Sequence, residues 1–113
     1  MNTTGIGRTG EDIACTYLKG NGYIVLKRNY RAARGEIDIV AKKGSLLAFV
    51  EVKTRKDRSF GLACEAVNAD KIRRIRSAAQ AFIIAYSDYE EIRFDVCEVY
   101  ALGGEINYIE NAF

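Results

Sequence analysis

Residues 36–53 read EIDIVAKKGSLLAFVEVK, in which two runs of strand-forming residues flank a short polar stretch. The polar stretch contains a glycine, so the segment predicts a β-hairpin whose second strand covers Leu46–Lys53. That second strand ends with Glu51 and Lys53, charged side chains that a buried strand normally excludes. Because burying a lone carboxylate is costly, Glu51 needs a partner, a bound cation or a wet cleft.

The position of the hairpin turn determines which side chains share a face of the sheet. If a two-residue turn lies at residues 43–44, Asp38 lies opposite Phe49. Asp38, Glu51 and Lys53 then project to one side, with the two carboxylates on a diagonal of roughly 7 to 8 Å. Two carboxylates at that separation can hold one cation between them, so we expect a metal site here.

The composition limits the chemistry of such a site. The chain has no histidine, which excludes Ser-His-Asp and Cys-His nucleophile systems and His-ligated zinc. Hard carboxylate oxygens select Mg²⁺ or Mn²⁺, and either ion binds phosphate oxygens and activates water for phosphodiester hydrolysis. Lys53 would orient that water or stabilise the charge of the transition state. The alternative is that these charges pair on a solvated sheet face, and the spacing alone leaves both interpretations open.

Further helices and strands are expected on either side of this hairpin. An N-terminal helix is expected to end at the Gly20–Gly22 stop, and Asn68 is expected to cap a second helix that extends to about Tyr86. The residues after Lys53, TRKDRSFGLACEA, are expected to form a loop. The order predicts an α/β fold, a mixed sheet of about five strands with helices packed on it. Strands are expected over residues 23–31, 36–41, 46–53, 92–102 and the INYI stretch.

Length and composition are typical of a single-domain protein. With 113 residues and 49% hydrophobic residues, the chain is expected to form one domain over residues 1–113. No apolar run approaches the roughly 18 residues of a membrane-spanning helix, and MNTTGIGRTG does not resemble a signal peptide, so we expect a cytoplasmic protein. Cys15, Cys64 and Cys97 have no CxxC spacing and are expected to be reduced core thiols. The net charge of +2 is too small to predict nucleic-acid binding by itself.

The central hairpin carries a motif that resembles a known nuclease signature. GEIDIVA followed by FVEVKTR resembles the D…(D/E)xK core of the PD-(D/E)xK nuclease superfamily, with Asp38, Glu51 and Lys53 at its three signature positions. With GRTGEDIACTYL, NYR, EAV, KIRRI, RFDV and NAF, the whole chain resembles the YraN family of bacterial proteins, which are nuclease-like. That family is similar in fold to archaeal Holliday-junction resolvases. The loop before EAV here lacks the proline usual in the family, which leaves the rigidity of that loop open.

The resemblance implies a three-layer, restriction-endonuclease-like α/β core around a mixed sheet. It also implies that Glu11, in the first helix, reaches the metal as a third acidic group. Asp38, Glu51, Lys53 and Glu11 are therefore the predicted catalytic residues, and the three acidic ones are the predicted ligands of Mg²⁺ or Mn²⁺. The implied substrate is nucleic acid, DNA before RNA, with branched DNA among its forms. A homodimer would suit two symmetric strand cuts.

Basic residues flank this constellation and are the predicted nucleic-acid contacts. Arg55 is the first choice, because it follows Lys53 by two positions on the same strand. The sequence thus predicts a metal-dependent nuclease. The alternative is a non-catalytic module that binds nucleic acid or protein on the same scaffold, because a fold does not establish activity. The predicted contacts are Arg8, Arg31, Arg34, Arg55, Lys71 and Arg74.

Overall fold

The computed structural model describes residues 10–56 and 68–113, and the helices and strands expected within those ranges are present. Most of the predicted loop after Lys53 lies outside the described residues, although the strand before it continues to Arg55. The elements are α2 (Gly10–Gly20), β1 (Ile24–Ala32), β2 (Gly35–Lys43), β3 (Leu46–Arg55), α3 (Ala69–Ala85), β4 (Glu91–Tyr100) and β5 (Ile106–Ile109).

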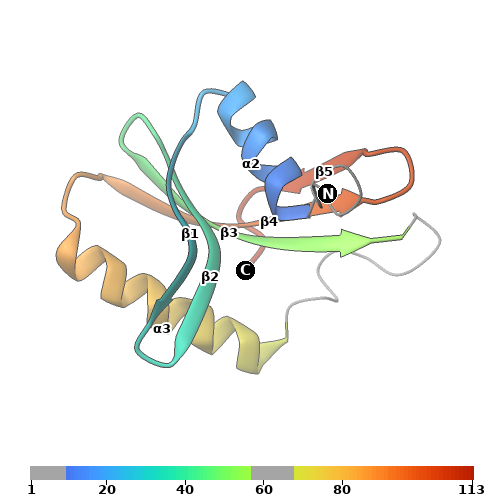
Figure 1. Cartoon of the computed structure of the whole chain (residues 1–113). Coiled ribbons are helices and arrows are strands. Elements are labelled where there is room, and N and C mark those ends of the chain that lie inside the picture. The colour runs from blue at the N-terminus through green and yellow to red at the C-terminus, as the bar shows by residue number, and fades with distance from the viewer. Residues whose placement is uncertain (1–9, 57–67) are drawn as a thin grey trace, which may run out of the picture.

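The strands form one five-stranded sheet in the order β1-β2-β3-β4-β5. Neighbouring strands are antiparallel except β3 and β4, which are parallel because α3 carries the chain across between them. α2 packs on one face of the sheet and α3 on the other (Figure 1). The predicted three-layer α/β core around a mixed sheet is therefore confirmed.

Side chains alternate along the central strands and build a separate apolar core on each face. Ile39 and Val50 join Leu18 of α2 in one core. Phe49 joins Phe82 of α3 in the other, with their ring centroids 6.0 Å apart in an edge-to-face arrangement. β3 is therefore buried on both faces, and the side chains that follow Phe49 at every second position face α3.

The β2–β3 hairpin turns one residue later than predicted. Its two-residue turn begins at Gly44 rather than at Lys43. Gly44 has a φ of 61°, a left-handed value that such a turn requires at its first position and that glycine adopts without a steric penalty. The predicted pairing of Asp38 with Phe49 is therefore wrong, because Phe49 pairs with Val40.

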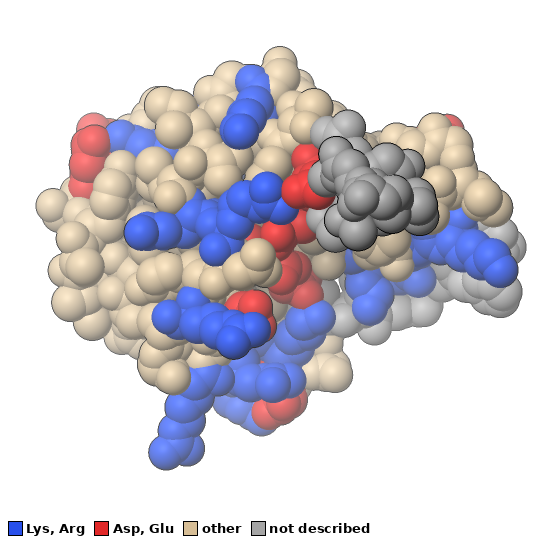
Figure 2. Space-filling view, viewed as in Figure 1, with Lys and Arg blue, Asp and Glu red and all other residues tan. Residues whose placement is uncertain are grey.

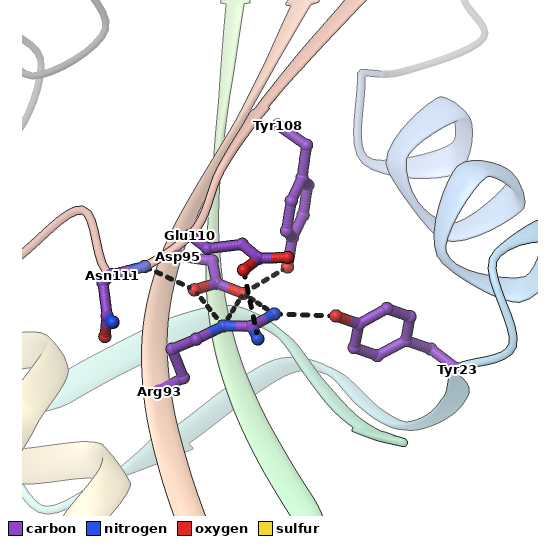
Figure 3. A network of polar contacts seen from close by, with 6 residues as sticks. All are labelled: Tyr23, Arg93, Asp95, Tyr108, Glu110 and Asn111. Atoms are coloured by element: carbon purple, nitrogen blue, oxygen red, sulfur yellow. Dashed lines mark hydrogen bonds and ion pairs between the residues drawn. The ribbon is translucent and has the colours of Figure 1, made fainter.

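A buried polar network ties the last strand to the rest of the sheet (Figure 3). Asp95, which is fully buried, accepts hydrogen bonds from Arg93, from the Tyr108 hydroxyl at 2.6 Å and from the Asn111 backbone N–H at 3.0 Å. Arg93 also donates to the Tyr23 hydroxyl at 2.7 Å. Because each buried charge has a partner, the network anchors β5 to β4 without leaving an unpaired carboxylate.

The thiols within the described residues lie in the core, as expected. Cys15 and Cys97 are free and buried beneath α2, and burial raises the pKa of Cys97 to about 12. Cys64 lies outside the described residues. None of the helices in the described part of the chain is long and apolar enough to cross a membrane.

Candidate active site

The candidate site begins where the pairing of β2 with β3 ends. The last paired residues at this end are Ile39 and Val50, although both strands continue beyond them. Past this point, the Asp38 carboxylate accepts a hydrogen bond from the Val52 backbone N–H at 2.8 Å. The Asp38 side chain thus takes the place of a strand carbonyl, which satisfies a backbone donor while the two strands separate.

Asp38 and Glu51 form a close carboxyl pair at this opening. Extending the observed register by one position beyond Ile39 and Val50 makes them direct neighbours rather than diagonal ones, and a hydrogen bond with Glu51 contributes to the raised pKa of Asp38. Glu51 is only 5% exposed. Burial, together with the charge of Glu51, raises the pKa of Asp38 from 3.8 to about 7. The pair concentrates negative charge that a proton or a cation has to offset.

Lys71, in the first turn of α3, forms an ion pair with this site through its Nζ and the Glu51 Oε2. The start of α3 is set by Asn68, whose side chain accepts a hydrogen bond from the Lys71 backbone N–H at 2.9 Å. Because the cap fixes the first helical turn, it also fixes the position from which the Lys71 side chain extends. No local pattern predicts the contact with Glu51, since the two residues are far apart in the sequence.

A pocket of about 350 Å³ contains Asp38 and Glu51 and is bordered by the β1–β2 turn, β3 and the start of α3. Four of the predicted nucleic-acid contacts line it, so the fold brings together cations from two separate segments. Figure 2 shows Lys and Arg side chains gathered around acidic ones near the centre of one face. Another predicted contact, Arg8, lies outside the described residues. The four lining cations are Arg31, Arg34, Lys71 and Arg74.

Gly35 allows the β1–β2 turn and α3 to approach closely enough to enclose this pocket. A Cβ atom at Gly35 would lie 1.7 Å from the Arg74 carbonyl oxygen, a distance that no side chain can accommodate. The preceding two-residue turn carries Arg34 beside this contact. The close approach therefore fixes the arginines of the hairpin next to the cations of α3.

Lys53 shares the face of Glu51, because residues two apart on a strand project to the same side. It does not line the pocket, and its register partner on the neighbouring strand is Glu98. Within residues 10–56 and 68–113, no ion pair engages the Lys53 ammonium. The structure therefore brings Asp38 and Glu51 together and leaves Lys53 at the edge of their site.

Arg55, the first choice for a nucleic-acid contact, already has a carboxylate partner within the protein. Its guanidinium bonds to Glu98, which is 2% exposed and also accepts hydrogen bonds from the Tyr100 hydroxyl and the Asn107 amide. Although burial alone would raise the pKa of Glu98, the hydrogen bonds from Tyr100 and Arg55 lower it overall. A phosphate would have to compete with this buried carboxylate for Arg55, whose contact with nucleic acid stays a prediction.

Glu11 lies near the acidic pair and has partners of its own. Its carboxylate accepts hydrogen bonds at 3.0 Å from both Arg28 and the Asn29 side chain, and its charge contributes to the raised pKa of Asp38. Asn29 has a φ of 51°, a left-handed value that is uncommon for a residue other than glycine. Sequence reasoning missed Arg28 and missed this role of Asn29, although the NYR stretch was a signal for the latter.

The donor set of Asp38 and Glu51 fits a hard divalent cation. Both supply carboxylate oxygens, which Mg²⁺ and Mn²⁺ prefer, and the pKa of Asp38 is raised by burial and by the nearby charge of Glu51, a charge that a bound cation would offset. Among the described residues, no three acidic or thiol side chains form a group that could hold a metal by themselves. The predicted three-ligand cluster with Glu11 is therefore not assembled, and water or substrate oxygens would have to supply the other ligands.

Comparisons with known proteins identify relatives along the whole chain. The family model described as "Uncharacterised protein family UPF0102" matches residues 10–99. UPF0102 proteins of Dictyoglomus turgidum and Clostridioides difficile are 42% and 45% identical, each over 100% of both chains. One from Alkaliphilus metalliredigens is 47% identical over 96% of each chain. Among solved structures, Pyrococcus furiosus SfsA in complex with Ca²⁺ is 19% identical with a TM-score of 0.35, covering 96% of this chain and 64% of that one.

Proposed function

The chain belongs to the uncharacterised protein family UPF0102, the YraN family that its motifs resemble, and we propose that it is a metal-dependent nuclease. The single observation that carries the proposal is the Asp38–Glu51 carboxyl pair, in which Glu51 is buried and Asp38 half-buried, inside a pocket lined by four cations. Carboxylates suit a divalent cation and the surrounding cations suit phosphates, so the two halves of the site match a phosphodiester. The proposed substrate is DNA, with branched DNA among its forms.

Asp38 and Glu51 would hold Mg²⁺ or Mn²⁺, which when bound supplies Lewis-acid polarisation of the phosphate and an acidified water. The Val52 N–H orients the Asp38 carboxylate, because it donates a hydrogen bond to one of the carboxylate oxygens at 2.8 Å. Glu51 is held by its burial and by Lys71. Each ligand is thus positioned by a second group, as metal ligands generally require.

The cations around the acidic pair have roles that follow from their places in the fold. Arg31, Arg34 and Arg74 line the pocket beyond the carboxylates, where they would bind backbone phosphates without reading sequence. Lys53 shares the strand face of Glu51 and would stabilise the charge that develops on the phosphate or its leaving group. Because Lys53 has no ion pair within the described part of the chain, its ammonium is available for that role.

The alternative function is a non-catalytic module that binds nucleic acid or protein. One observation favours it: within the described ranges, no three acidic or thiol side chains form a metal group, so the site holds fewer protein ligands than the family resemblance implies. A weak metal site would leave the cationic pocket able to bind phosphates while turnover stayed too slow to detect.

A cleavage panel separates these two functions. Labelled linear, flapped and four-way-junction DNA, with matched RNA, would be incubated with the protein and Mg²⁺ or Mn²⁺ beside an equilibrium binding assay. We expect metal-dependent cleavage of at least one substrate, lost in Glu51→Gln, which removes a charge while keeping the shape of the side chain. Binding without cleavage of any substrate would refute the nuclease and support the module. Light scattering on the same samples would test the proposed homodimer.

A further inference from the structure

Lys71 differs from the other cations of the pocket in the partner that it contacts. Arg31 pairs with Glu36 at 3.5 Å and Arg74 with Asp70 at 3.3 Å, and these carboxylates are well exposed. Lys71 instead pairs with Glu51, which is 5% exposed and belongs to the acidic pair. Among the cations that line the pocket, Lys71 thus neutralises the proposed metal ligand Glu51.

We propose that Lys71 is an internal counter-ion that competes with a divalent cation for Glu51 and, once displaced, binds the phosphate of the substrate. The inference rests on the proposed function of the same site and assigns this residue a second role within it. A lysine side chain has a flexible four-carbon stem, and the Lys71 side chain is 36% exposed, so its ammonium can leave Glu51 while its backbone stays fixed. The pocket that Lys71 lines also contains Arg31, Arg34 and Arg74, so a phosphate bound there would meet several cations.

The ion pair gives the buried Glu51, which lies beside a second carboxylate, a counter-ion in the absence of a metal. Removing the partner of a buried charge is strongly destabilising, so Glu51 requires a counter-ion whenever no metal is present. Lys71 meets that requirement, and for the same reason it opposes metal binding. Since the displaced ammonium gains a partner when a phosphate enters the pocket, metal and nucleic acid should strengthen one another's binding.

The direct test is the affinity for Mn²⁺ alone, measured by titration calorimetry. Lys71→Met keeps the length of the stem and deletes the charge, so we expect Mn²⁺ to bind on the order of tenfold more tightly than to the wild type. Lys71→Arg keeps the charge and should stay within about threefold of the wild type. Arg74→Met is the matched control, because it removes a cation from the same pocket without removing a partner of Glu51.

A second measurement separates this role from a general electrostatic effect. In a Glu51→Gln background, Lys71→Met should no longer change the response to Mn²⁺, because the residue for which the two cations compete is gone. In EDTA, Lys71→Met should melt below the wild type, and Mn²⁺ should restore more of its melting temperature. A merely structural Lys71 would lower the melting temperature without increasing the affinity for Mn²⁺.

The outcomes distinguish this proposal from the nuclease proposal. Equal or weaker Mn²⁺ binding by Lys71→Met, or no Mn²⁺ binding by either protein, would overturn the counter-ion role. If Lys71→Met binds Mn²⁺ and the wild type does not, the result would support the counter-ion role, because Lys71 would then block the metal completely. If Lys71→Met binds Mn²⁺ more tightly while no nucleic acid is cleaved, the counter-ion role stands and the nuclease proposal fails.

Discussion

Replacing Asp38 by Asn tests the central feature of the site, the close carboxyl pair of Asp38 and Glu51. Asn has the same shape, can still accept the hydrogen bond from the Val52 N–H, and can donate one to Glu51. The substitution therefore removes one charge from the pair and retains its packing. Because the pKa of Asp38 is raised in the folded protein, that charge should destabilise the metal-free protein at neutral and alkaline pH.

The magnitude follows from the shift of the Asp38 pKa from 3.8 to about 7. At about 1.36 kcal/mol per pH unit, a change of the Asp38 pKa from 3.8 to about 7 corresponds to a free energy on the order of 4 kcal/mol, which belongs to the Asp38–Glu51 pair as a whole. The folded state holds the proton more tightly than the unfolded state does, so this contribution is fully present below pH 3.8 and is lost as the pH rises through about 7. Asp38→Asn should match the wild type near pH 4 and exceed it by up to about 4 kcal/mol near pH 8.

Urea denaturation in EDTA at several pH values between 4 and about 8.5 would measure this difference in the free energy of unfolding. Glu36→Gln is the matched control, because Glu36 borders the same pocket but is well exposed and pairs with Arg31. It should follow the wild type at every pH. Parallel pH profiles for Asp38→Asn and the wild type would refute the close, mutually repelling carboxyl pair.

The remaining predictions concern the metal, the chemistry and the cations. Millimolar Mn²⁺ should raise the melting temperature of the wild type by mass action but not that of Asp38→Asn, and equal shifts would contradict the metal site. Lys53→Met should slow single-turnover cleavage about a hundredfold to a thousandfold with little change in affinity; an unchanged rate would remove Lys53 from the chemistry. Arg34→Ala should weaken binding about equally across sequences and lessen its salt dependence, which fluorescence anisotropy at several salt concentrations would show. Arg55→Ala should lower the free energy of unfolding by about 3 kcal/mol in urea denaturation, because it removes the guanidinium that forms an ion pair with the buried Glu98; a stable variant with weakened binding would instead support Arg55 as a nucleic-acid contact.

The secondary structure and the face that carries the candidate site could be predicted from the sequence. Apolar residues at helical spacing after Asn68 correctly predicted α3, and the side chain of Asn68 caps it. The alternation in FVEVK correctly placed Glu51 on the face of Phe49. These features depend on local backbone geometry and on side-chain periodicity, which neighbouring residues determine.

The register of the β2–β3 hairpin could be predicted from the sequence only to within one residue. The polar stretch predicted a turn, but a shift of one residue separates a turn that begins at Lys43 from one that begins at Gly44. The left-handed backbone at Gly44 favours the turn that begins at Gly44. The resulting register places Asp38 directly across from Glu51 rather than on a diagonal.

Only the tertiary structure decided which partner each long charged side chain takes. Lys71 and Arg55 were both predicted to contact nucleic acid, yet the first pairs with Glu51 and the second with Glu98. Both carboxylates are buried, and each lies on a different helix or strand from its cationic partner and far from it in the sequence. The periodicity of a segment determines the face of the helix or strand from which a side chain projects. Its ion-pair partner depends on which buried carboxylate the folded chain brings within reach, because a buried charge requires a counter-ion.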